Sequence, residues 1–127
     1  MTNFPYQKGA LREYFPIIEL NVGYKKETVK IQTLVDSGAT ISVFRPQVAQ
    51  FLKLPIENGK EIFLGGVGGR IKGYLHNLEL QIVNKVFVAP VVFSYEYTVS
   101  ISLLGRDEVF KHFKILFDEK NLKVVFE

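Results

Sequence analysis

Asp36 is the residue best placed to do chemistry in this sequence, because it directly follows the apolar pair Leu34-Val35. A carboxylate beside a buried apolar strand is costly unless it is hydrogen-bonded, paired or functional. The chain has only three aspartates, Asp36, Asp107 and Asp118, against ten glutamates. General acid–base chemistry that needs a pair of aspartates therefore has a short list of candidates. The structural alternative is an aspartate that caps the following turn.

A second candidate segment is rich in glycine. Five of the ten glycines fall between Leu64 and Tyr74, namely Gly65, Gly66, Gly68, Gly69 and Gly73. The segment does not fit a dinucleotide-binding fingerprint, because Ile71 stands where the third glycine is needed. A P-loop is also excluded, because Gly59-Lys60 is followed by Glu61. Two interpretations remain: a plain hairpin tip, or a mobile tip whose backbone pairs with an extended peptide.

Composition excludes several other kinds of site. Without cysteine the chain has no disulfides and no thiolate ligands, and two histidines, His76 and His112, disfavour a metal centre. We therefore expect no metal and no cofactor. The net charge of +3 is spread along the chain, with Lys25-Lys26 as the densest group, which disfavours nucleic-acid binding. With no apolar run near the ~20 residues that span a bilayer, and no secretory signal, we expect a soluble, cytoplasmic protein without membrane contact.

The length of 127 residues predicts one domain, 1–127, in which strand patterns dominate. Strands are predicted at 15–22, 28–35, 61–64, 75–83 and 86–93, with a turn at 84–85 and a C-terminal hairpin of 114–117 and 122–126. Short helices are predicted at 46–52, where proline suits the first turn, and at 107–112, where acids precede bases. This pattern predicts an all-β class, either a closed barrel or a sandwich.

Three segments together resemble the retropepsin-like aspartic proteases. Leu34-Val35-Asp36-Ser37-Gly38-Ala39 is similar to their active-site loop, and Leu103-Leu104-Gly105-Arg106-Asp107 to their third motif. Between these, Gly65-Gly66-Val67-Gly68-Gly69-Arg70-Ile71-Lys72 is similar to the flap of the retroviral enzymes. The segments occur in the family's order, and the resemblance covers about residues 15–126. It implies a closed retropepsin-like barrel with a β-hairpin flap that acts as a homodimer.

The resemblance also implies a mechanism for hydrolysing polypeptides. Asp36 and its counterpart in a second copy would hold a water and share one proton, because two adjacent carboxylates do not both ionise easily. One carboxylate would take a proton from the water while the other polarises the scissile carbonyl. Ser37 is implied to hydrogen-bond across the dimer and Gly38 to allow a tight turn. Substrate contacts are implied for Gly38, Ala39, Thr40, Gly65, Gly66, Val67, Gly68 and Gly69.

The sequence departs from the family pattern at Thr40, where retroviral enzymes usually carry an acid that pairs with the third-motif arginine. Gly105, Arg106 and Asp107 are implied as the structural third motif, but the partner of Arg106 stays open: Asp107, another acid, or solvent. The C-terminal segment 114–126 is more similar to the hairpin of cellular members. The alternative function is a catalytically inactive peptide-binding or dimerisation domain, against which the intact active-site loop argues.

Overall fold

The computed structural model describes residues 1–66 and 68–127, and its elements are mostly strands, as predicted. The strands are β1 (Thr2–Pro5), β2 (Gln7–Lys8), β3 (Tyr14–Phe15), β4 (Ile17–Tyr24), β5 (Glu27–Val35), β6 (Ser42–Phe44), β7 (Lys60–Gly66), β8 (Gly69–Ile82), β9 (Lys85–Phe93), β10 (Ser102–Leu104), β11 (Ile115–Asp118) and β12 (Lys123–Phe126). The helices are α1 (Pro46–Phe51) and the 3₁₀ turns η1 (Ile56–Asn58) and η2 (Phe110–His112). None of the helices in the described part is long and apolar enough to cross a membrane.

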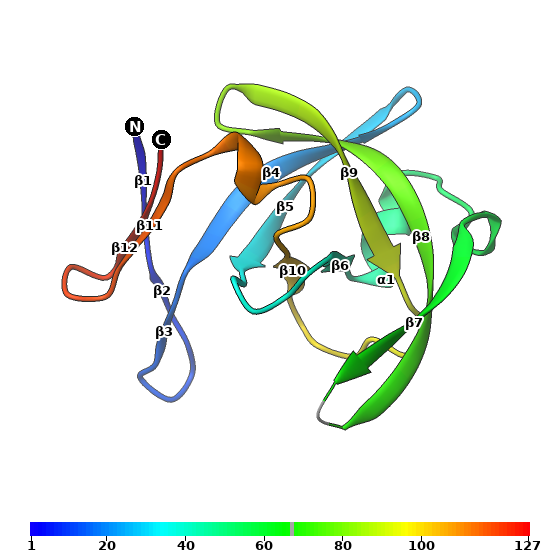
Figure 1. Cartoon of the computed structure of the whole chain (residues 1–127), viewed down its shortest axis with the longest axis horizontal. Helices are drawn as coiled ribbons and strands as arrows, with labels where there is room; N and C mark the ends of the chain where they lie inside the picture. Colours follow the sequence, from blue (N-terminus) through cyan, green and yellow to red (C-terminus); the bar gives the residue numbers. More distant parts are fainter. Residues whose placement is uncertain (67) are drawn as a thin grey trace.

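The main sheet has seven strands in the order β4-β5-β10-β6-β9-β8-β7. β4 also pairs with β8, so the pairings return to their first strand and β7 extends from β8 as a hairpin (Figure 1). Side chains such as Val22, Phe44, Leu80 and Leu104 are fully buried inside this ring of strands. Apolar residues of β4 alternate with more exposed ones, which is the pattern of strands with one face in the core.

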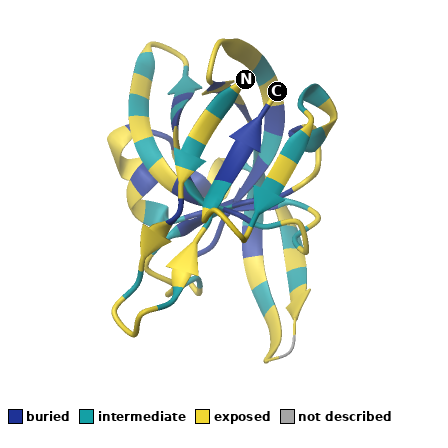
Figure 2. Cartoon of the chain, turned by 90° about the vertical axis from the view of Figure 1, so that its left-hand side faces the viewer, coloured by how far each residue is buried: buried dark blue, intermediate teal, exposed yellow. Residues whose placement is uncertain are grey.

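The two termini lie side by side in a second sheet, in which β12 runs between β1 and β11. Figure 2 shows the buried β12 flanked by these two more exposed strands. Phe4 packs edge-on against Phe126 at 5.7 Å between ring centroids, which attaches the first strand to the core. The sequence pattern did not predict β1, or the short pairing of β2 with β3 that follows it.

The helix predicted at 107–112 is wrong. The segment forms turns that end in the 3₁₀ turn η2, because Glu108 has a φ of 57° and interrupts the helical backbone. The predicted first helix is confirmed as α1, with Pro46 at its start. The turn between β8 and β9 lies at Val83-Asn84, one residue earlier than predicted, with Val83 at a φ of 58°.

Truncating the ring's core should destabilise the protein strongly. Leu80 is fully buried, so Leu80→Ala removes apolar contacts and leaves a cavity, at about 2–5 kcal/mol in the free energy of unfolding. Leu116→Ala is the matched control, because Leu116 is 56% exposed and should change stability by less than about 1 kcal/mol. Urea unfolding at one protein concentration compares them, and equal losses would contradict this placement of the core.

Candidate active site

The Asp36 carboxylate stands at the end of β5 in a loop that orients it. Its Oδ1 accepts a hydrogen bond of 2.9 Å from the Gly38 N–H, and its carbonyl accepts one of 3.2 Å from the Ala39 N–H. The Asp36 N–H donates to the Leu104 carbonyl at 3.0 Å. The aspartate is partly buried, whereas Ser37 and Gly38 are exposed. This turn therefore fixes the side chain near the surface of the single chain.

The third motif holds the same loop from the neighbouring strand. β10 pairs in parallel with the end of β5, and the chain beyond it bonds to the loop through its backbone. The Arg106 N–H donates to the Ala39 carbonyl at 3.0 Å, and the Asp107 N–H donates to the Thr40 carbonyl at 2.7 Å. The structure therefore brings the predicted loop residues 36–40 and the third-motif residues 105–107 together.

Gly105 makes this close approach possible. A Cβ at this position would lie 2.5 Å from the backbone carbon of Ile41, too close for any side chain. The Gly105 N–H donates to the Oγ of the buried Ser42 at 3.0 Å, so its polar group is satisfied in the interior. The glycine of the third motif is thus required by packing.

The guanidinium of Arg106 reaches Thr40, with 3.5 Å between Nη2 and Oγ1. This is a long contact, at the limit of a hydrogen bond. Among residues 1–66 and 68–127, no carboxylate forms an ion pair with Arg106, so Asp107 does not take the place of the missing acid. Arg106 and Asp107 are both exposed and act on the loop through their backbone N–H groups.

The glycine-rich segment forms the end of the β7–β8 hairpin. Gly65 pairs with Arg70, and Gly66 with Gly69, while the predicted contact residue Val67 lies outside the described residues. No atoms lie within 4 Å of a Cβ built on the tip glycines Gly65, Gly66, Gly68 and Gly69. Gly69 alone among them needs glycine for its backbone, because its φ is +116°.

A groove of about 330 Å³ lies beneath this hairpin. It is lined by hairpin, β6 and β10 residues, namely Val43, Leu64, Gly65, Gly66, Gly68, Gly69, Ile71, Tyr97 and Leu103. Of the residues predicted to contact substrate, the hairpin glycines line it, whereas Gly38, Ala39 and Thr40 are not in its lining. The lining is mostly apolar, which suits the side chains of a peptide more than a charged small molecule.

Tyr97 also lines the groove. Its turn-like sequence context is compatible both with a groove residue and with a plain turn residue, and the structure places it in the groove. Its hydroxyl donates to the Ile101 carbonyl at 2.6 Å. The pKa of Tyr97 is raised to about 12, chiefly by burial; the charge of Arg45 opposes this rise, and the charge of Asp36 adds to it. Tyr97 therefore presents a neutral ring to the groove and lies within electrostatic reach of Asp36.

The fold is mostly β, and its parallel strands β5 and β10 join an aspartate loop to a Gly-Arg-Asp segment. This is the class of fold found in aspartic proteases. A family model described as aspartyl protease matches residues 19–107, and the chain belongs to this family. The retropepsin-like family predicted from the sequence is confirmed by this match together with the structural one below.

Among solved structures, the fold is similar to EIAV protease complexed with the inhibitor HBY-793. The TM-score is 0.61 and the identity 17%, over 84% of this chain and 93% of the viral chain. At this identity the likeness concerns the fold. No curated protein sequence matches the chain.

Adding a methyl group at Gly105 should disrupt the junction of loop and third motif. Gly105→Ala would force the backbone at Ile41 to shift, at a cost of roughly 1–3 kcal/mol in the free energy of unfolding. Gly66→Ala is the control, because a Cβ there meets open space and its φ is not positive. Thermal and urea unfolding of both variants test this; a Gly105→Ala protein as stable as Gly66→Ala would contradict the close contact.

Removing the Tyr97 hydroxyl should reduce the loss of stability in alkaline solution. The pKa of about 12 in the folded chain exceeds the ordinary value of 10.0, so the folded state binds the phenolic proton more tightly. The free energy of unfolding should therefore fall as pH rises from about 10 towards about 12. Tyr6, also raised to about 12, adds to this fall, so Tyr97→Phe removes only part of it. Urea unfolding across this range measures the slope, and an unchanged slope would contradict the raised pKa of Tyr97.

Proposed function

We propose that this protein is an aspartic endopeptidase that hydrolyses extended polypeptides as a homodimer, with Asp36 of each copy forming the catalytic pair. The observation that carries the proposal is the solitary aspartate in the loop that the third motif holds. Peptide-bond hydrolysis by this class of chemistry needs two carboxylates, and the family assignment supports that reaction. One chain therefore supplies half of a site.

The exposure of the loop supports completion by a second copy. Ser37 and Gly38 are exposed in the single chain although they flank a carboxylate that the fold holds firmly. A two-fold axis beside this loop would bring the two Asp36 side chains face to face and place Ser37 against the partner loop. The loop would then become buried, and water would be limited to the molecule held between the carboxylates.

The proposed reaction divides the two carboxylates into a base and an acid. Adjacent carboxylates share one proton, because the charge of the first opposes ionisation of the second. The ionised Asp36 takes a proton from the bound water, which attacks the scissile carbonyl carbon. The protonated Asp36 donates its hydrogen bond to the carbonyl oxygen, where negative charge develops. Collapse of the tetrahedral intermediate returns a proton to the leaving amine.

The β7–β8 hairpin is proposed as a flap over the substrate. β7 is the last strand in the order of the sheet, so the backbone N–H and C=O groups on its outer edge would pair with an extended peptide. The apolar groove beneath the hairpin would take a substrate side chain next to Tyr97. The ring of strand pairings supports the closed barrel that holds these parts in place.

Replacing Asp36 should abolish proteolysis. The purified protein is incubated with a denatured protein mixture at pH about 4–6, and Asp36→Asn is expected to lower cleavage by at least roughly 10²-fold because it removes the general base and acid. Asp118→Asn is the matched control, because Asp118 ends β11 in the C-terminal hairpin and its carboxylate accepts hydrogen bonds from Asn121. A pepstatin-type inhibitor should suppress the cleavage that both the unmodified chain and Asp118→Asn show.

Cleavage that persists in Asp36→Asn would contradict the proposed catalytic residue. A folded, unmodified chain that cleaves nothing under these conditions would instead favour the inactive peptide-binding domain. Circular dichroism of each variant distinguishes a lost catalytic group from a lost fold.

Mixing experiments should reveal a site shared between copies. When the unmodified chain exchanges subunits with an equal amount of Asp36→Asn, half of its subunits enter mixed dimers with one carboxylate pair incomplete. The activity should therefore fall to about half of that of the unmodified chain alone. Mixing with Asp118→Asn should cause no such fall. Activity unaffected by Asp36→Asn would indicate that each chain works alone.

A further inference from the structure

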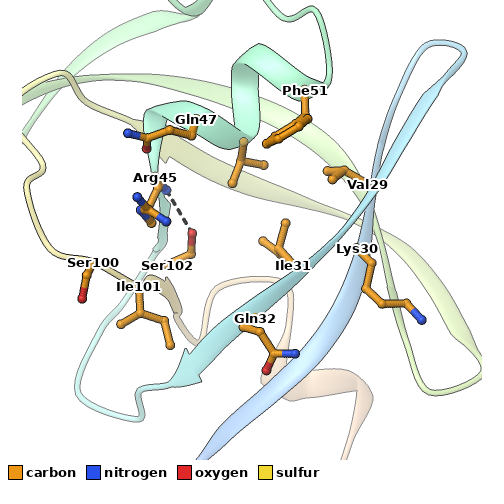
Figure 3. Close-up of a pocket in the computed structure, with 11 residues that line it drawn as sticks. Val29, Lys30, Ile31, Gln32, Arg45, Gln47, Phe51, Ser100, Ile101 and Ser102 are labelled. Atoms are coloured by element: carbon orange, nitrogen blue, oxygen red, sulfur yellow. Dashed lines mark hydrogen bonds between the residues drawn. The ribbon is translucent and has the colours of Figure 1, made fainter. Parts of the chain in front are cut away.

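A second cavity, of about 310 Å³, lies between the first half of β5 and helix α1 (Figure 3). It is lined by Val29, Lys30, Ile31, Gln32, Arg45, Gln47, Val48, Phe51, Ser100, Ile101 and Ser102. None of these residues lines the groove beneath the β7–β8 hairpin. The cavity is thus separate from the site proposed for peptide cleavage.

One border of this cavity is a strand edge with which no strand of the described part pairs, although helix α1 packs against β5. The Val35 N–H bonds to Pro16 on the β4 side, and the Asp36 N–H bonds to Leu104 on the β10 side. The backbone N–H and C=O groups of successive residues point to alternate edges of a strand. Lys30 therefore turns its N–H and C=O to the same edge as the Asp36 N–H, which is the β10 side. β10 pairs with β5 only at 33–35, so within the described residues no strand covers this edge at 28–32.

The cavity lining is consistent with an accessible main chain. Four successive residues of β5, 29–32, contribute to it, although successive side chains of a strand point to opposite faces. Because this cavity contacts residues whose side chains point to opposite faces of the strand, it must lie at the strand's edge. The free edge therefore offers backbone donors and acceptors of the kind that bind an added strand.

The side chains on the two faces of this edge differ in character. Val29 and Ile31 are half-buried and lie with Phe51 in the cavity, and Phe51 is 69% exposed although it is a large apolar residue. Lys30 points to the opposite, exposed face of the strand, and Arg45 adds a second positive charge to the lining. The lining contains no acid, and among the described residues neither cation forms an ion pair.

We propose that this edge binds an extended acidic peptide segment, which adds to β5 as a strand. Apolar side chains of the segment would enter the cavity beside Ile31 and Phe51, and acidic ones would lie beside Lys30 on the exposed face. The free stretch 28–32 accommodates about five residues at roughly 3.3 Å each. The positive lining favours acidic segments and opposes basic ones. This site is independent of the proposed cleavage reaction.

A blocked peptide of alternating glutamate and valine is the probe, and one of alternating lysine and valine is its control. The full chain is ¹⁵N-labelled and carries Asp36→Asn, so that the probe is not cleaved. The acidic peptide should shift the amide signals of Lys30 and Gln32 in a saturable way, and hydrogen exchange at the Lys30 N–H should slow. This slowing reports a new backbone hydrogen bond, which charge attraction alone would not produce.

Charge reversal tests the selectivity. Lys30→Glu/Arg45→Glu should weaken binding of the acidic peptide roughly tenfold, which corresponds to about 1.4 kcal/mol. Lys114→Glu/Lys120→Glu makes the same change in net charge on the C-terminal hairpin, which contributes no residue to the cavity lining, and should weaken binding far less. Three outcomes would each overturn the proposal. The two peptides could bind equally well, the amide shifts could be confined to Gly65, Gly66 and Gly69, or the exchange rate at the Lys30 N–H could stay unchanged. The outcome is separate from the cleavage assay, so either proposal can fail alone.

Discussion

The structure depends on one backbone junction, where the chain after β10 bonds to the loop after β5. The contact joins two segments that are distant in the sequence, and it leaves no room for a Cβ at Gly105. Three backbone bonds, from Asp36 to Leu104, from Arg106 to Ala39 and from Asp107 to Thr40, fix both ends of the aspartate loop. A carboxylate held in this way is preorganised, so the proposed reaction would not need to reorder the loop. Because the contact is distant in sequence, the site forms only when most of the chain has folded.

Local chemistry made much of the candidate site predictable. Asp36 follows a strand that alternates and then becomes apolar. Gly105, where packing against Ile41 excludes a side chain, belongs to a short motif that the sequence shares with the family. The aspartate loop, the glycine-rich hairpin and the third motif could therefore be located without the structure. The family match confirms the assignment to which these motifs led.

What sequence reasoning missed depends on distant partners or on single backbone angles. β1 is a strand because β12, at the far end of the chain, pairs with it, and no local pattern marks it. The helix expected at 107–112 had suitable charges at both ends, yet the positive φ of Glu108 interrupts it. For Tyr97 the sequence left a groove residue and a plain turn residue both open; the loop that folds back with the hydroxyl on Ile101 is what places it in the groove.

The short β10 connects the groove beneath the β7–β8 hairpin with the free edge of β5. The strand covers only 33–35 of β5, because the chain before it forms the loop that carries Tyr97 to the groove. A longer β10 would pair with the rest of β5 but would draw this loop away from the groove. The free edge at 28–32 therefore follows from the need to build the groove wall. The Asp36 carboxylate directly follows one end of β5, and unpaired backbone groups lie toward its other end. One strand therefore contributes to both the proposed cleavage site and the proposed peptide-binding edge.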